Sequence, residues 1–333
     1  MDPLDRSDPI RIGDISLRGR LGFGGMGRVY FGVTDDREPV AIKVIREELA
    51  ARAEVRARFA RETDALRTVQ GPHIAALVDA SDEGEERPWF AVEYIRGLTL
   101  KEFVESRGPL DETHVAALGV VLTGALKDIH TAGLFHRDLK PANVILGRDG
   151  PKVIDLGLVA FADGPTDLTT TESTIGTPSC MSPEQANTPK HITAAADVYA
   201  LGATLLFALT KHYPYDGATV AHMLMNIISA DKPPNLDGLS DRTRPLVEKM
   251  LAHNPTARPT VAQTHDWLQE LCGPAALKRL VEATYVERET DPPDIAPPSR
   301  PPRKDLSEVV VPGSVVAKLA DRLRSVYSVN AAF

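Results

Sequence analysis

The most informative stretch of this chain lies near its middle and reads His136-Arg137-Asp138-Leu139-Lys140-Pro141-Ala142-Asn143. The carboxylate of Asp138 can orient a hydroxyl group and accept its proton. The ammonium of Lys140, two residues later, can neutralise a phosphoryl group during its transfer. Asn143 can add an uncharged oxygen to the ligands of a metal ion. The pattern predicts a site at which a phosphoryl group meets a hydroxyl.

A second carboxylate for a metal ion follows in Asp155-Leu156-Gly157, twelve residues after Asn143. Mg²⁺ prefers oxygen ligands and takes several of them from substrate phosphates, so two protein residues are enough to hold it. Each piece alone would be an ordinary polar loop. Their order along the chain favours one centre, in which Asn143 and Asp155 bind the metal.

On the N-terminal side, the segment Gly22-Phe23-Gly24-Gly25-Met26-Gly27-Arg28-Val29 contains a GxGxxGxV pattern. Dinucleotide-binding βαβ units share such a pattern, but there the glycines open a helix. Here a strand-like stretch, 28–33, follows, which predicts a hairpin that bends back over a ligand. Glycines let backbone amides approach phosphate oxygens because no Cβ intervenes. A plain glycine-rich turn is the alternative.

Lys43 ends the apolar stretch Val40-Ala41-Ile42-Lys43. A lysine in an apolar strand is costly unless its ammonium has partners, and phosphate oxygens together with a carboxylate would supply them. Glu62, on the helix expected next, is the candidate carboxylate. Glu54 is its rival, since helix register alone does not exclude it. The alternative is a lysine whose ammonium extends to solvent.

Hydrophobic periodicity divides the chain into a strand-rich and a helix-rich part. Alternation over 15–45 predicts antiparallel strands, and a period of three to four residues over 47–68 predicts one amphipathic helix. Further strands are expected over 74–78, 89–94, 144–146 and 153–154, and helices from Asp111 onward and over 193–210, 219–230, 240–252 and 260–271. The predicted regions are an N-terminal extension (1–12), a sheet-rich lobe (13–97), a mainly helical lobe (98–272) and a tail (273–333).

The tail differs in composition from the rest. Residues 291–304 are rich in proline and favour extended polyproline II. Ser314 can then cap a short helix over 315–326. The proline-rich part fits a solvated spacer, with a docking peptide as the alternative.

The amino-acid composition argues against several classes of protein. With 333 residues, of which 43% are hydrophobic and 25% charged, the chain is long enough for about two domains and is not disordered throughout. A net charge of −8 disfavours binding of nucleic acid or anionic membrane through bulk charge. Its two cysteines, Cys180 and Cys272, fit reduced thiols.

No signal peptide is evident, and the most apolar stretch, Ile192 to Leu209, contains Asp197. A carboxylate in that position favours a buried core helix over a membrane span. These features predict a soluble protein of the cytoplasm.

The motifs together resemble eukaryotic-type (Hanks-type) protein serine/threonine kinases over about residues 13–271. The spellings FGGMGRVY at 23–30, SPEQA at 182–186 and DVYALG at 197–202 are most similar to the bacterial branch of signalling kinases. The resemblance implies an α+β bilobal protein-kinase fold, with an antiparallel-sheet N-lobe carrying one long helix, a mainly helical C-lobe, and the Pro-rich tail. It also implies transfer of the γ-phosphoryl group of ATP to Ser/Thr hydroxyls, with Mg²⁺ as the metal cofactor and Mn²⁺ as the alternative.

The resemblance assigns roles to individual positions. Asp138 would be the catalytic base, with Lys140, Lys43 and Glu62 in supporting catalytic roles. Val92 would be the gatekeeper, and Glu93 to Ile95 the hinge that binds adenine. The full nucleotide-binding set is Leu21, Gly22, Gly24, Gly25, Gly27, Val29, Ala41, Lys43, Val92, Glu93, Ile95 and Ile145.

Positions outside the nucleotide set are implied in the same way. Glu184 would pair with Arg258, and Asp197 would anchor the catalytic loop. Lys140 and Thr177 are the pair that the family uses for Ser/Thr substrates. Leu156 and Ser182 depart from the phenylalanine and alanine of the family pattern, and neither is an essential catalytic position.

Regulation is predicted from Arg137, a cation that needs an anion. The loop between Asp155 and Glu184 offers the acceptors Thr169, Thr171 and Thr174, with Thr170 and Ser173 beside them. We expect autophosphorylation there, which requires at least a transient homodimer if it occurs between molecules. The expected partners are protein substrates, including the chain itself.

Two alternatives remain. An ATP-binding pseudokinase or scaffold should lack Lys43, Asp138 or Asp155, and all three are present. A small-molecule phosphotransferase would not be expected to carry Lys140, Thr177 and the Ser-Pro-Glu segment.

Overall fold

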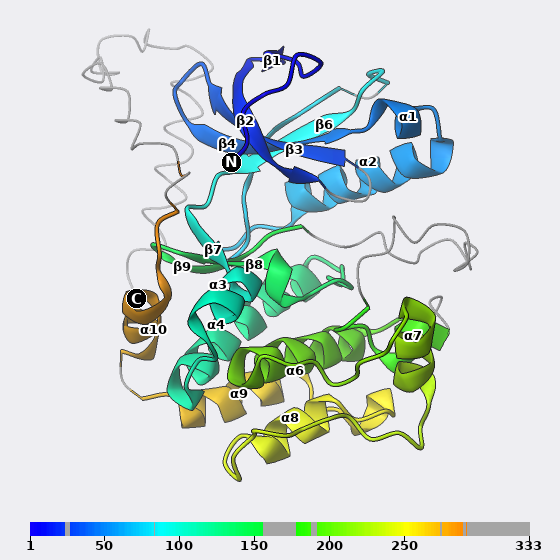
Figure 1. Cartoon of the computed structure of the whole chain (residues 1–333), viewed down its shortest axis with the longest axis vertical. Coiled ribbons are helices and arrows are strands. Elements are labelled where there is room, and N and C mark those ends of the chain that lie inside the picture. Colours follow the sequence, from blue (N-terminus) through cyan, green and yellow to red (C-terminus); the bar gives the residue numbers. More distant parts are fainter. Residues whose placement is uncertain are drawn as a thin grey trace, which may run out of the picture. The chain divides into compact units, whose positions relative to one another are not determined.

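The strands of the N-terminal lobe form one sheet with the order β1-β2-β3-β4-β6-β5, and all its pairings are antiparallel. Its strands are β1 (Arg11–Ile12), β2 (Ile15–Phe23), β3 (Gly27–Thr34), β4 (Pro39–Ile45), β5 (Leu77–Ala80) and β6 (Trp89–Glu93). The computed structural model describes residues 1–23, 27–82, 84–155, 178–187, 192–273, 275–288 and 291, without the side chains of Phe23, Glu54 and Arg58. The chain divides into two units, Met1–Pro293 and Asp294–Phe333, and the fold described here is that of the first (Figure 1).

Strand β4 shows how the sheet positions a site. Alternate apolar side chains are buried in a small core on one face of the sheet, namely Val40, Ile42 and Val44. Successive strand residues point to opposite faces, so Ala41 and Lys43 lie on the other face. Paired residues of an antiparallel sheet share a face, and this places three more side chains beside them: Val29, Phe90 and Val92.

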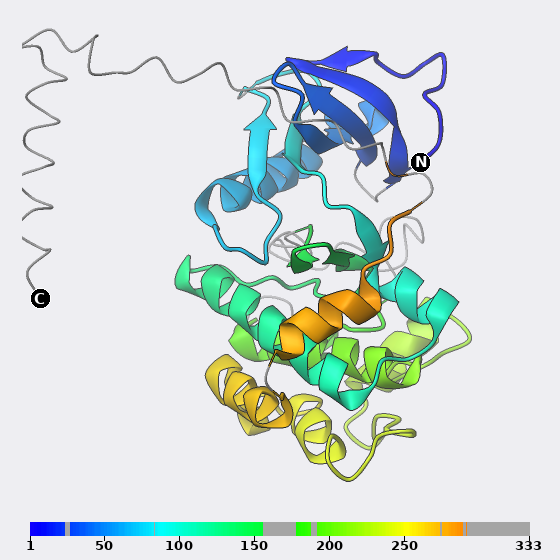
Figure 2. The ribbon, with the colours of Figure 1, turned by 90° about the vertical axis from the view of Figure 1, so that its left-hand side faces the viewer.

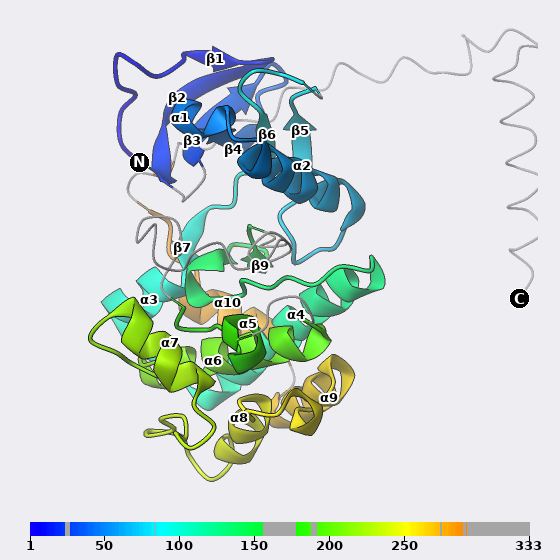
Figure 3. The ribbon, with the colours of Figure 1, turned by 90° about the vertical axis from the view of Figure 1, so that its right-hand side faces the viewer.

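The expected single helix over 47–68 is wrong, because two helices occupy that stretch, α1 (Glu47–Ala50) and α2 (Ala53–Thr68). Arg52, the residue before α2, has an extended backbone with φ −83° and ψ 112°, which interrupts the helical turns. Helix α2 lies beneath the sheet (Figure 3). It contributes Phe59, Ala65 and Leu66 to the main hydrophobic core.

The second lobe is mainly helical, and a small sheet of β7, β8 and β9 joins its upper part. Its helices are α3 (Leu100–Arg107), α4 (Glu112–Thr131), α5 (Pro183–Asn187), α6 (Ala194–Thr210), α7 (Val220–Ile228), α8 (Arg244–Met250), α9 (Val261–Leu271) and α10 (Ala276–Thr284), with the 3₁₀ turns η1 (Pro141–Asn143) and η3 (Pro255–Ala257). The small sheet consists of β7 (Gly97–Thr99), β8 (Val144–Gly147) and β9 (Gly150–Val153). The expected division into a sheet-rich lobe and a mainly helical lobe is confirmed.

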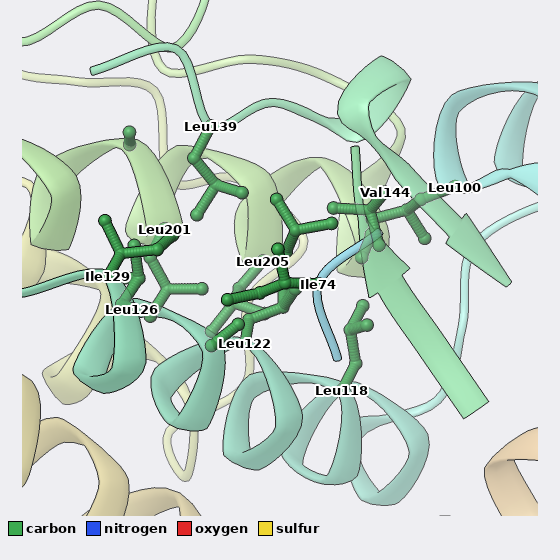
Figure 4. Packing of buried hydrophobic residues seen from close by; sticks show 14 of the residues in the cluster. Ile74, Leu100, Leu118, Leu122, Leu126, Ile129, Leu139, Val144, Leu201 and Leu205 are labelled. Carbon is green, nitrogen blue, oxygen red and sulfur yellow. The ribbon is translucent and has the colours of Figure 1, made fainter. Parts of the chain in front are cut away.

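Helices α4 and α6 form the centre of the helical lobe. Leucines at helical spacing on α4 and residues of α6 belong to the same core cluster (Figure 4), and the labelled members of the two helices are Leu118, Leu122, Leu126, Ile129, Leu201 and Leu205. Asp197 on α6 is completely buried. The expected core helix is therefore confirmed. In the part of the chain that is described, no helix combines the length and the apolar character that crossing a bilayer requires.

Three further features differ from the sequence-based expectations. Helix α3 was not expected, although Thr99 and Glu102 form a capping box at its start. Helix α10 lies beyond the expected lobe boundary at residue 272, yet its Leu280 is fully buried in the main core. Strand β1 pairs with β2 across the expected boundary after residue 12. The helix expected over 315–326 lies outside the described residues.

Candidate active site

The loop that carries Asp138 is held by Asp197 of α6. The buried carboxylate of Asp197 accepts hydrogen bonds from the backbone N–H of His136 at 2.9 Å and of Arg137 at 2.8 Å. The imidazole of His130 lies 2.7 Å from the same carboxylate. Arg137 has a φ of +64°, a left-handed conformation that is costly for a residue other than glycine. The carboxylate fixes the loop in this strained form.

Asp138 is both oriented and accessible. Its Oδ2 accepts hydrogen bonds from Lys140 Nζ at 2.6 Å and from Asn143 Nδ2 at 3.1 Å. The same amide nitrogen donates to the backbone carbonyl of Asp138 at 2.8 Å. With 41% of its side chain exposed, the carboxylate can meet a hydroxyl from outside.

His136 is buried and accepts a hydrogen bond from the N–H of Asp138 on Nδ1 at 3.2 Å. This contact assigns the acceptor role to Nδ1. Burial lowers the pKa of His136, so the ring is favoured in its neutral form. His136 therefore supports the backbone of the loop rather than supplying a charge.

Lys43 joins the two lobes. Its ammonium contacts Glu62 Oε1 of α2 at 2.7 Å and Asp155 Oδ1, which follows β9, at 3.1 Å. Burial alone would lower the pKa of Lys43, but the carboxylates of Asp155 and Glu62 outweigh burial and raise it. Lys43 in turn holds the pKa of Asp155 below its usual value. The ammonium is therefore charged, and of the two candidate carboxylates on α2 the structure brings Glu62 to it. The side chain of Glu54 lies outside the described residues.

A pocket of about 340 Å³ opens between the lobes beside these groups. Its volume lies in the range of small-molecule sites, ~300–1,000 Å³. Nine of the twelve residues expected to bind nucleotide line it: Leu21, Gly22, Val29, Ala41, Lys43, Val92, Glu93, Ile95 and Ile145. Residues of β4 in one lobe and of β8 in the other thus line the same cavity.

The other three expected glycines do not line the pocket in the described structure. Gly24 and Gly25 lie outside the described residues. A Cβ on Gly27 would lie 2.4 Å from the carbonyl oxygen of Val44. Glycine at that position is thus required by the close approach of β3 to β4. Gly22, by contrast, faces open space.

The sequence analysis predicted Tyr94 only as part of the hinge, and it missed several residues that line the pocket, which are Leu66, Ile74, Ala75, Phe90, Gly97, Thr99, Glu102, Ala142, Val153, Ile154 and Arg288. Strand pairing with Lys43 could have identified Phe90. The capping-box spacing could have placed Thr99 and Glu102 at a helix start beside the hinge. No local signal points to Arg288, which lies 191 residues after Gly97.

The donor set fits a hard divalent cation. The amide nitrogen of Asn143 is engaged with Asp138, which makes its oxygen the atom available to a metal ion. The side chain of Asp155 is 46% exposed. Among the described residues, no group of three or more His, Cys, Asp or Glu side chains gathers to hold a metal ion. A cation held by Asn143 and Asp155 would therefore complete its ligands with phosphate oxygens, as Mg²⁺ commonly does.

Glu184 and Arg258 form a bidentate pair, with contacts of 2.6 Å and 2.8 Å between their guanidinium nitrogens and carboxylate oxygens. The side chain of Arg258 is fully buried, and its guanidinium also stacks on Tyr199 at 4.9 Å. Gln185, beside Glu184, donates to the carbonyl of Arg137 at 2.8 Å. Helix α5 is thereby held both to the helical lobe and to the loop that carries Asp138.

The remaining expected site residues lie outside the described part of the chain. They are Leu156 and Thr177, together with the acceptors Thr169, Thr170, Thr171, Ser173 and Thr174. Arg137 itself is described, and its buried Nε has no hydrogen-bond partner among the described residues.

Comparisons with known proteins agree with this geometry. Residues 15–268 match the family described as protein kinase domain. The serine/threonine-protein kinase AfsK of Streptomyces coelicolor is 43% identical over 262 residues, which cover 79% of this chain and 32% of AfsK. The serine/threonine-protein kinase PknB of Mycobacterium tuberculosis is 34% identical over 266 residues, which cover 77% of this chain and 41% of PknB.

A crystal structure of the Mycobacterium tuberculosis PknI kinase domain superimposes with a TM-score of 0.63 at 25% identity, covering 80% of this chain and all of that one. The chain spans well under half the length of AfsK or PknB. The family match covers more than half of this chain. The chain therefore belongs to the protein kinase domain family.

Proposed function

We propose that this chain is an ATP-dependent protein serine/threonine kinase, which transfers the γ-phosphoryl group of ATP to Ser/Thr hydroxyls of proteins. The main support for this proposal is that four polar side chains from distant parts of the chain lie beside one pocket. They are Lys43, Asp138, Asn143 and Asp155. The names of the curated relatives support the same activity.

The proposed reaction breaks the bond between the γ-phosphorus and its bridging oxygen and forms a bond from phosphorus to the acceptor hydroxyl. ADP leaves with the electron pair of the broken bond. Asp138 accepts the hydroxyl proton, and Lys140 balances charge on the transferred group. Lys43 holds the α- and β-phosphates, with Glu62 fixing its ammonium.

Asn143 and Asp155 are the residues that would hold the divalent cation, with Mg²⁺ proposed ahead of Mn²⁺. When bound, the cation neutralises charge on the phosphate oxygens. The hinge, Glu93 to Ile95, offers backbone groups for adenine. The apolar side chains of Val29, Ala41 and Ile145 would exclude water around the base.

The transfer itself is tested with γ-labelled ATP, Mg²⁺ and a generic protein acceptor. We expect label in phosphoserine and phosphothreonine of the acceptor and of the chain, and loss of labelling when EDTA removes the cation. Label that appears only in a small-molecule alcohol would support a small-molecule phosphotransferase instead. Binding of ATP without any transfer would support a pseudokinase or scaffold.

Autophosphorylation at Thr169, Thr171 or Thr174 is a further proposal. The buried Nε of Arg137, unpartnered among the described residues, supports it, since a phosphate is an anion that such a cation can bind. We expect phosphatase-treated protein to show a lag in activity that preincubation with ATP and Mg²⁺ removes. Mass spectrometry should then find phosphate on these threonines. An active enzyme that is unmodified over 162–184 would contradict this proposal.

If the reaction occurs between molecules, the lag shortens as the protein concentration rises. This dependence tests the transient homodimer. The cytoplasmic location stays a prediction from the sequence.

A further inference from the structure

The chain after the last helix of the family match takes part in the first compact unit. The match ends at residue 268, whereas that unit extends to Pro293. Helix α10 packs on α4 and on β8 and β9, with Leu280 fully buried. From the end of α10 the chain rises toward the connection between the lobes (Figure 2). We call the described residues Ala276–Arg288, together with Asp291, the C-terminal strap.

The strap is fastened to the hinge region by polar contacts. Arg288 Nε donates to the carbonyl of Gly97 at 3.0 Å. The phenol of Tyr94, which follows Glu93, donates to the carboxylate of Asp291 at 2.5 Å. The same carboxylate accepts the backbone N–H of Arg288 at 2.8 Å, so Asp291 fixes both the hinge tyrosine and the strap.

A further ion pair joins Arg96 to Glu287 at 3.2 Å. The strap thus contacts the chain at Tyr94, Arg96 and Gly97, which surround the connection between the two lobes. At the α10 end the strap is held by the burial of Leu280, and at its other end it is held by hydrogen bonds and ion pairs of charged side chains. Because both ends of the strap make contacts, its position relative to the hinge region is fixed.

Arg288 also reaches the nucleotide pocket. It lines that pocket together with Thr99 and Glu102, and its guanidinium forms an ion pair with Glu102. Oε2 of Glu102 receives this contact and two more, from the N–H of Thr99 at 2.8 Å and from its hydroxyl at 2.9 Å. Among the described contacts Oε1 of Glu102 has none. One carboxylate oxygen is therefore fixed, and the other is available to a ligand.

The position of Glu102 indicates which part of a ligand it would meet. Adenine at the hinge and phosphates at Lys43 leave the sugar of ATP between them. Thr99 and Glu102 continue the wall of the pocket from the hinge into α3. A carboxylate oxygen there can accept hydrogen bonds from sugar hydroxyls.

We propose that Arg288 is a positioning residue of the nucleotide site: it orients Glu102 toward the sugar hydroxyls of ATP, and the C-terminal strap holds it in place. This inference rests on the proposed use of ATP. It adds to the site a segment that the family match does not include.

The test measures the dissociation constants of ATP and 2′-deoxy-ATP by calorimetry for the full chain, so it does not depend on phosphoryl transfer. We expect Arg288→Ala to weaken ATP binding about tenfold, because a charge-assisted contact that orients a ligand group is lost. Binding of 2′-deoxy-ATP should weaken less, by no more than about threefold, because it lacks one of the two sugar hydroxyls that Glu102 can meet. The preference for ATP over 2′-deoxy-ATP should therefore shrink.

Matched variants separate positioning from a loss of folding. Lys278→Ala removes an exposed ion pair from the same strap and should leave both constants unchanged. Arg288→Lys retains a cation for Glu102 and should restore most of the affinity. The double variant Arg288→Ala/Glu102→Ala should bind ATP no more weakly than Glu102→Ala alone, because the two residues act as one unit.

Three outcomes would overturn the inference. One is equal ATP affinity in Arg288→Ala and Lys278→Ala. Another is additive loss in the double variant. The third is tighter binding in Arg288→Ala, which would mean that the arginine obstructs the pocket. A wild-type chain that binds no ATP would refute the proposed function itself.

Discussion

Replacing Asp138 by asparagine is expected to lower kcat for phosphoryl transfer by about 10²–10⁴-fold, the usual contribution of a positioned general base. The amide has nearly the shape of the carboxylate but cannot accept the hydroxyl proton. The KM for ATP should stay within about threefold, because Asp138 does not line the nucleotide pocket. Initial rates over a range of ATP and acceptor concentrations separate the two constants.

Asp149→Asn provides the matched control. Asp149 lies exposed in the turn between β8 and β9, so the same chemical change there should leave kcat unchanged. Equal thermal stability of the two variants would show that the fold is intact. Asp138→Asn with more than a tenth of the wild-type kcat would remove Asp138 from its role as the base.

Replacing Lys43 by methionine is expected to reduce kcat by about 10²–10³-fold, the scale seen when one preorganised charge or donor is removed from a reacting centre. The change removes the cation between Glu62 and Asp155 and leaves both carboxylates facing the phosphates without it. Methionine keeps the apolar length of the side chain. Binding of ATP should be partly retained, since the hinge and the apolar walls are untouched.

Lys127→Met, at an exposed position of α4, controls for the loss of a lysine and should leave kcat unchanged. Glu62→Gln should reproduce part of the Lys43→Met defect, because Lys43 would keep its charge but lose its charged partner on α2. Full activity of Lys43→Met would mean that the contacts among the three residues are structural only.

The arrangement of the residues around Asp138 could be predicted from local sequence because these residues stand at fixed short spacings. Lys140 and Asn143 reach Asp138 from within the same loop. The alternation of β4 likewise predicted that Lys43 needed partners, since a lysine on an enclosed face must be paired. A charge inside an apolar stretch similarly indicated a structural role for Asp197, and its carboxylate accepts hydrogen bonds from the backbone of the loop that carries Asp138.

Features that depend on distant contacts could not be predicted in this way. Whether Glu62 or Glu54 contacts Lys43 depends on where α2 starts and how it lies against β4. The hydrophobic periodicity over 47–68 gives no information on the start of the helix or on its packing. The obligatory glycine at position 27 follows from the approach of β3 to β4, although its motif pointed to phosphate. Arg288 enters the pocket through the docking of α10, which brings together residues almost two hundred positions apart.

The most direct test of the account is a crystal structure of the full chain with a non-hydrolysable ATP analogue and Mn²⁺, whose anomalous signal locates the metal. The account predicts adenine at Glu93 to Ile95, phosphates at Lys43, and the metal bound by Asn143 and Asp155. A nucleotide bound elsewhere, or a metal that contacts neither Asn143 nor Asp155, would contradict it.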